Sequence, residues 1–161
     1  LRYIAFMFEV LAFVYENYYT GETRPEPAHL KRKLSAVGFE SDEIGDALAW
    51  LNGLDTAACT TQPEPWLVQP SPSSIRIYPA HEQNHLGRQA LGFIRFLESA
   101  NVLPPHMREV VIDRAMAAPG GPIGLDDLKI IVLMVYWGFG QEPDALVLDE
   151  LCDDAQVRIA H

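Results

Sequence analysis

Residues 38–54, GFESDEIGDALAWLNGL, constrain the fold more than any other stretch of this chain. Ser41 can cap the amino end of a helix here, and the two acids that follow it suit the positive end of a helix dipole. Apolar side chains then recur at helical spacing, at Ile44, Ala47, Leu48, Leu51 and Leu54. The segment therefore predicts an amphipathic helix that carries acids but no Lys or Arg.

Two more helices are predicted before this segment. The first is expected over 2–19, where an apolar and aromatic run ends at Thr20-Gly21. The second is expected over 27–37, between a proline-containing loop and Gly38. Three short helices in this order indicate a trihelical, helix-turn-helix-like core, whose third helix is the one that reads DNA in proteins of that class. Here that helix offers negative charge where a DNA reader needs cations.

A change of composition marks residues 55–74, which are rich in Pro, Ser and Thr, and we interpret them as a connector. The prolines in this segment exclude a regular helix. Two short strand candidates, 66–68 and 75–78, lie within it and directly after it. If these strands pair as a β-hairpin, they form a wing, and residues 1–78 become a winged-helix-like module.

Residues 79–161 are expected to form a second domain, a bundle of helices. The apolar pattern predicts one helix after Pro79 that ends near Asn101, and another that begins at Pro104-Pro105. On the second of these helices four charged side chains are predicted to face outward: Arg108, Glu109, Asp113 and Arg114.

The centre of this bundle is predicted at 130–137, a run of apolar and aromatic residues that is too short to span a membrane. A buried strand is the alternative, because β-branched residues are frequent in the run, but the acids at 126–127 favour a helix. The last segment, 142–161, predicts an acidic amphipathic helix. The chain as a whole is therefore predicted to be mainly α.

The net charge of −10 disfavours binding to nucleic-acid phosphates, which requires clustered cations. Lys31, Arg32 and Lys33 are a local exception on the second predicted helix. Together with Arg76 in the predicted wing, they would be the binding residues of a winged-helix nucleic-acid-binding protein. This function is the alternative that the sequence leaves open.

The leading hypothesis is a non-enzymatic adaptor or regulator that binds an unidentified protein partner through its acidic surface. Asp42, Glu43 and Asp46, near the start of the third helix, are the candidate partner-binding acids. Trp66, which lies beside prolines, is the candidate aromatic anchor.

Residues 81–85, HEQNH, match the HExxH pattern of zinc peptidases, in which two histidines bind the metal and the Glu acts as general base. Pro79 places the pattern in the first turn of a helix, where a rigid metal platform is not expected, and no third ligand is evident. No phosphate-binding glycine loop or GxSxG elbow is present either. We therefore predict no enzyme activity, no cofactor and no metal, and keep a zinc hydrolase using His81, Glu82 and His85 as a remote alternative.

Cys59 and Cys152 are far apart and suit neither a disulfide framework nor a zinc site, so a reducing, cytoplasmic setting is expected. Charged residues interrupt the apolar first helix at helical intervals, which argues against a signal peptide or a membrane span. No membrane partner is predicted.

Six blocks of the sequence, in the same order, resemble the bacterial Smg family, whose members are largely uncharacterised. They are MFEVLAFVYENYY from Met7, GFESDEIGDALAWLNGL, SIRIY from Ser74, GFIRFLE from Gly92, VLPPHMREVVIDRAMA from Val102 and LDDLKIIVLMVYW from Leu125. The resemblance covers nearly the whole chain and supports Met7 as the native start. It implies a cytoplasmic bacterial protein whose genes often lie near DNA-processing and topoisomerase-related genes. It implies no established activity, so no catalytic residue is carried over.

Overall fold

The structure is a computed structural model that describes residues 2–18, 26–60, 75–145, 147 and 149–151. These residues are mainly helical, as predicted, and none of them lies in a strand. The helices are α1 (Arg2–Tyr18), α2 (Pro27–Val37), α3 (Ser41–Thr60), α4 (Ala80–Ser99), α5 (Pro105–Ala117) and α6 (Leu125–Gly138). Further helical residues follow at 145, 147 and 149–151.

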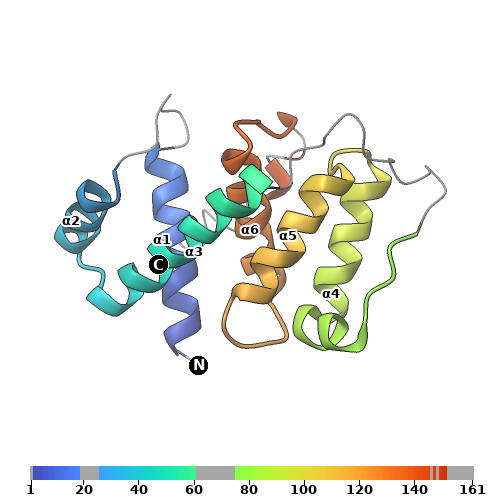
Figure 1. Cartoon of the computed structure of the whole chain (residues 1–161), viewed down its shortest axis with the longest axis horizontal. Helices are drawn as coiled ribbons and strands as arrows, with labels where there is room; N and C mark the ends of the chain where they lie inside the picture. The colour runs from blue at the N-terminus through green and yellow to red at the C-terminus, as the bar shows by residue number, and fades with distance from the viewer. Residues whose placement is uncertain (1, 19–25, 61–74, 146, 148, 152–161) are drawn as a thin grey trace.

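The helices form one elongated packing, with α2 at one end of the longest axis and α4 at the other (Figure 1). Between them, α3 packs against α1, α2, α5 and α6, while α5 packs against α3, α4 and α6. One hydrophobic cluster contains buried residues from all six of these helices. The division into domains at residue 78 stays a prediction, but the segments on its two sides share this core.

Helix α6 is the apolar centre of the fold, and its residues 128–136 are all buried. The helix that the sequence favoured over a strand is thus confirmed. Lys129 is the exception in this apolar run, since it is only 6% exposed. Its Nζ lies 3.6 Å from Glu150 Oε1 and 5.6 Å from the centroid of the Phe93 ring. Leu151 is fully buried, so the start of the predicted C-terminal helix docks on the core, while 152–161 lie outside the described residues.

The connector predicted at 55–74 begins too early, because α3 continues through residues 55–60. No proline interrupts this part, and Ala57 and Ala58 are good helix formers. The hydroxyls of Thr56 and Thr60 donate to carbonyl oxygens of the preceding turn, which keeps these polar side chains on the helix.

The predicted wing is not confirmed, because 75–78 is extended but unpaired with any strand among the described residues, and the partner candidate 66–68 lies outside them. Ile75 and Ile77 are 86% and 84% exposed, whereas Arg76 and Tyr78 face the helices. Ion pairs and ring contacts of the inward side chains thus hold the segment extended, in place of a strand ladder.

Candidate functional site

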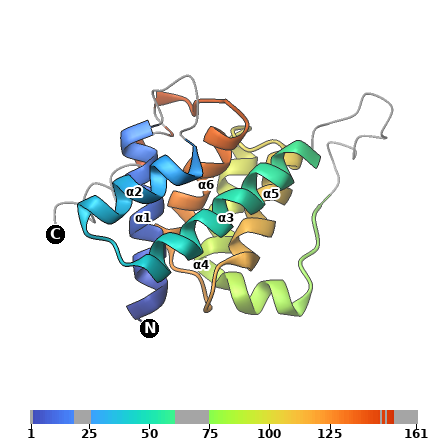
Figure 2. The same cartoon turned by 60° about the vertical axis from the view of Figure 1, so that its left-hand side comes forward.

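Helix α3 has one buried and one exposed face. The buried face packs into the core through Ile44, Ala47, Trp50, Leu51, Leu54 and Ala58. The exposed face carries the acids Asp42, Asp46 and Asp55 together with small residues such as Gly45 and Ala49. Because α3 contains no Lys or Arg, every charged side chain on this face is negative. Figure 2 shows α3 crossing the front of the molecule between α2 and α5.

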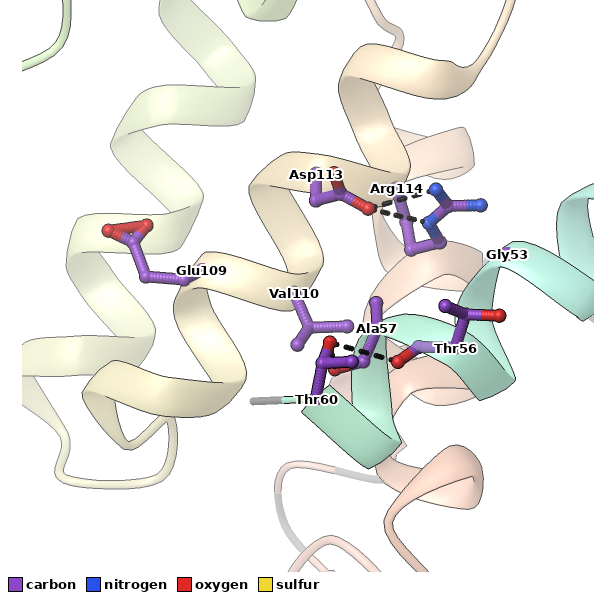
Figure 3. A pocket seen from close by; sticks show the side chains of 8 residues that line it. All are labelled: Gly53, Thr56, Ala57, Thr60, Glu109, Val110, Asp113 and Arg114. Atoms are coloured by element: carbon purple, nitrogen blue, oxygen red, sulfur yellow. Dashed lines mark hydrogen bonds and ion pairs between the residues drawn. The ribbon is translucent and has the colours of Figure 1, made fainter. Parts of the chain in front are cut away.

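A groove of about 440 Å³ lies between the carboxyl half of α3 and α5 (Figure 3). Its α5 wall carries Glu109 and Asp113, two acids one helical turn apart that are 41% and 58% exposed. The complete lining is Gly53, Thr56, Ala57 and Thr60 from α3, with Glu109, Val110, Asp113 and Arg114 from α5. The lining therefore combines small and apolar residues with the oxygen atoms of two threonines and two acids and with the guanidinium of Arg114.

Arg114 closes one end of the groove. Its Nη1 donates to the carbonyl oxygen of Trp50 at 3.1 Å, and its Nε and Nη2 contact Asp113 Oδ2 at 3.0 and 2.9 Å. A Cβ atom on Gly53 would collide with the guanidinium, so the glycine leaves the space that Arg114 occupies. The charge of Arg114 is thus neutralised within the protein.

The prediction that the charged residues of α5 all face outward is wrong for its two arginines. The side chains of Arg108 and Arg114 are only 14% and 12% exposed. Arg108 pairs with Glu98 of α4 and with Glu109, whereas Arg114 lies against α3. Long cationic side chains can bury their stems between helices while their ends meet carboxylates and carbonyls, which an outward-facing pattern does not reveal.

The four predicted nucleic-acid-binding residues do not come together. Lys31, Arg32 and Lys33 are exposed on α2, and Lys33 Nζ lies 5.2 Å from the centroid of the Tyr18 ring. Arg76 pairs with Glu82 of α4 and with Glu109 of α5. Helix α4 lies at the opposite end of the longest axis from α2 (Figure 1). The hydrogen bond from Arg76 lowers the pKa of Glu82 below its ordinary value.

The predicted partner-binding acids lie together at the start of α3, but they differ in what they do. Glu43 accepts a hydrogen bond from the Glu40 amide at 3.1 Å and so helps to cap the helix. Asp42 and Asp46 are exposed. Trp66 lies outside the described residues.

The residues of the HExxH pattern have separate partners. His81 is exposed, Glu82 binds Arg76, and Nε2 of His85 donates to the carbonyl oxygen of Ala115 at 3.0 Å. The pattern occupies a short helical segment that ends at Gly87, where a φ of 80° interrupts α4. In the described part of the chain, no three His, Cys, Asp or Glu side chains are grouped so that they could hold a metal ion.

Neither the α3–α5 groove nor the position of Arg114 was predicted from the sequence. The one signal in the sequence was Gly53, because a glycine inside a helix often marks a place where another group approaches closely.

The helices within the described ranges include none with the length and apolar character needed to cross a membrane.

Comparisons with known proteins agree on one family. The family model described as "Protein of unknown function (DUF494)" matches residues 7–161. The chain is 56% identical to a Protein Smg homolog of Leptothrix cholodnii, 55% identical to one of Methylibium petroleiphilum and 48% identical to one of Bordetella pertussis. Each match extends over 155 residues, which is 96% of this chain and the full length of the relative. No solved structure matches the chain.

Proposed function

Since this chain belongs to the DUF494 family, the family of the Smg homologues, we propose that it is a non-enzymatic adaptor that binds a protein partner in bacterial DNA or RNA metabolism. The observation that carries the proposal is the exposed face of α3, on which every charged side chain is acidic. The opposite face of this helix is buried in the core, so α3 is not free to enter a DNA groove with that side. An anionic face of this kind repels phosphates and attracts cationic protein surfaces.

The engagement of polar side chains supports a binding role over a chemical one. Catalysis usually requires an acid, base or nucleophile whose reactive atom is directed at a substrate. Here Glu82 and His85 hold neighbouring segments together, and Arg114 ties α3 to α5. The assignment to DNA or RNA metabolism is supported by the gene neighbourhood that the Smg resemblance implies.

The test compares protein capture with oligonucleotide binding. The full chain is immobilised and exposed to a bacterial lysate at low and at high salt, and captured proteins are identified by mass spectrometry. We expect one or a few proteins that bind specifically at low salt and are released at high salt. In parallel, fluorescence anisotropy with duplex and single-stranded oligonucleotides should show no binding at physiological ionic strength. Specific oligonucleotide binding without any captured protein would contradict the proposal.

A second candidate function, nucleic-acid binding, is favoured by one observation: Lys31, Arg32 and Lys33 are all exposed on α2. This function requires affinity that falls steeply with salt and falls again when these three residues are replaced by Ala. Arg76 is not expected to contribute, because two carboxylates already neutralise it. The same anisotropy experiment therefore separates the two functions. Arg76→Ala is the control variant, since it also removes a cation but should leave oligonucleotide binding unchanged.

A further inference from the structure

We propose that the exposed face of α3, with the groove that it forms with α5, docks a cationic amphipathic helix of a partner protein. This inference rests on the proposed function and names the docking surface and the chemistry of the partner. Four lines of observation carry it: the sign of the charges, the small side chains along α3, the acceptor atoms in the groove and the position of the α2 cations.

The charge along α3 is one-sided, because its exposed charged residues are Asp42, Asp46 and Asp55. At the groove, α5 adds Glu109, which also pairs with Arg76 and Arg108, and Asp113. Arg114 is the one cation that lines the groove, and Asp113 neutralises it. A partner that brings Lys or Arg side chains is therefore favoured, and an anionic partner is repelled.

Small residues run along α3 at intervals of four, at Gly45, Ala49, Gly53 and Ala57. Positions spaced by four lie on one side of a helix and form a shallow row between taller side chains. A Cβ atom added at Gly45 would meet nothing within 4 Å, so this end of the row is open. The other end, Gly53 and Ala57, forms part of the groove. Arg114 covers the row at Gly53, so a partner helix can approach closely at the exposed part, Gly45 and Ala49, with its ridge of side chains beside the acids of α3.

Apart from the guanidinium of Arg114, the polar side-chain atoms that line the groove are acceptors. The hydroxyls of Thr56 and Thr60 donate to carbonyl oxygens of α3, so towards a ligand they can only accept. Both contacts of Arg114 go to Oδ2 of Asp113, and in the described part of the chain Oδ1 accepts no hydrogen bond (Figure 3). A volume of about 440 Å³ lies within the usual range for small-ligand pockets, so the ends of long side chains can enter. Ammonium and guanidinium groups, which only donate, match these walls.

The exposed cations of α2 limit where such a partner lies. Helix α2 packs against α3, and Lys31, Arg32 and Lys33 would repel a cationic helix on that side. The partner helix is therefore expected on the α5 side of α3, where the row of small residues leads into the groove. This position distinguishes the docking surface from one on α2.

The test uses the full chain and a synthetic probe, an amphipathic helical peptide with Lys on one face and Ala and Leu on the other. A peptide of the same pattern with Glu in place of Lys is the charge control. Affinity is measured by fluorescence anisotropy, and the contact surface is mapped by amide chemical-shift changes in two-dimensional NMR. We expect the Lys peptide alone to bind, with shifts concentrated at residues 42–60 and 109–114.

Two variants test the surface without altering the core. Asp46→Lys reverses an exposed charge and should weaken binding by about fivefold, the scale of surface charge effects. Ala49→Gln fills the row of small residues without a change of charge and should weaken binding as well. Glu142→Lys, an equal charge reversal at an exposed position outside α3 and α5, is the matched control and should bind as the wild type does within a factor of about two.

Several results would overturn the docking surface: no binding of the Lys peptide, equal binding of the Glu peptide, shifts confined to α2, or equal weakening by Asp46→Lys and Glu142→Lys. The capture experiment separates this failure from failure of the proposed function. If the wild type and the Asp46→Lys and Ala49→Gln variants all capture the same partner equally well, the adaptor function stands and the docking surface is wrong. If no variant captures a protein and the Lys peptide does not bind, both are wrong.

Discussion

Trp50 and Arg114, 64 positions apart, exchange two hydrogen bonds between α3 and α5. The indole Nε1 of Trp50 donates to the carbonyl oxygen of Arg114 at 3.0 Å, and the guanidinium donates back to the carbonyl oxygen of Trp50. The Arg114 carbonyl belongs to the last turn of α5, where no amide within the helix can reach it. The next carbonyl, that of Ala115, accepts from the Ala118 amide at 3.2 Å and also from His85 of α4. Side chains from two neighbouring helices thus complete the carboxyl end of α5.

Replacing Trp50 by Phe should destabilise the protein by about 1–3 kcal/mol, because the Arg114 carbonyl loses its donor and the phenyl ring fills less of the buried space than the indole. The free energy of unfolding from urea titration, followed by circular dichroism, measures the effect. Arg114→Lys removes the return bond and should cost a similar amount, about 1 kcal/mol. If the urea midpoint of unfolding is unchanged in both variants, the hydrogen bonds between Trp50 and Arg114 do not hold α3 to α5.

Two glycines of α3 provide a matched comparison. Gly45→Ala should stabilise the protein by about 0.5–1 kcal/mol, because the added methyl group meets nothing and Ala is the better helix former. At Gly53 the same gain in helix propensity is offset, because the methyl group displaces Arg114 from its bond to Trp50. In thermal and urea unfolding, the free energy of unfolding of Gly53→Ala should be at least about 1 kcal/mol lower than that of Gly45→Ala. Equal stabilisation by the two changes would mean that Arg114 does not depend on the space at Gly53.

The Arg76–Glu82 pair predicts a stability difference that depends on pH. The folded-state pKa of Glu82 lies below its ordinary value of 4.5, because Arg76 donates a hydrogen bond to the carboxylate. The pair therefore stabilises the folded state fully above about pH 4.5, and the contribution is lost as pH falls through the lower, folded-state pKa. Arg76→Gln and Glu82→Gln should each be less stable than the wild type near pH 7, with the difference shrinking steadily below pH 4.5. A difference that does not change with pH would exclude this pair as its origin.

The two histidines of the HExxH pattern should respond differently to replacement. His81→Ala changes an exposed side chain and should alter the unfolding free energy by less than about 0.5 kcal/mol. His85→Ala removes one of the two donors to the Ala115 carbonyl, the other being the Ala118 amide, and should cost about 1 kcal/mol. Elemental analysis of the purified proteins adds an independent measurement. Zinc bound in stoichiometric amount and lost equally in both variants would instead support the hydrolase alternative.

Local signals made most helices predictable. The helix predicted over 27–37 matches α2, and Pro105 begins α5 as expected, because prolines and glycines fix such boundaries through the chain's own geometry. Residues 75–78 were predicted as a strand because inward and outward side chains alternate there, but this alternation occurs in any extended segment, whether or not it pairs with another strand. Its hydrogen-bonding partner is not encoded locally.

The groove could not be predicted, because it exists only where α3 and α5 meet. Periodicity placed Arg108 and Arg114 on the polar side of α5, which is correct for the helix taken alone. Their partners, Glu98 and the Trp50 carbonyl, lie on other helices, so only the packing brings the guanidinium groups inward. The acids of α3, by contrast, were found from sequence, because they lie opposite a clear apolar stripe.

Lys129 is a buried charged side chain within the apolar helix α6, and it pairs with Glu150. A uniformly apolar helix would accept residues 149–151 in several positions with similar energy, since contacts between aliphatic side chains discriminate little. A single ammonium group within α6 favours the alignment that brings Glu150 to it, and a shift by one turn would separate the two charges. The cation thereby favours one register of residues 149–151 against α6.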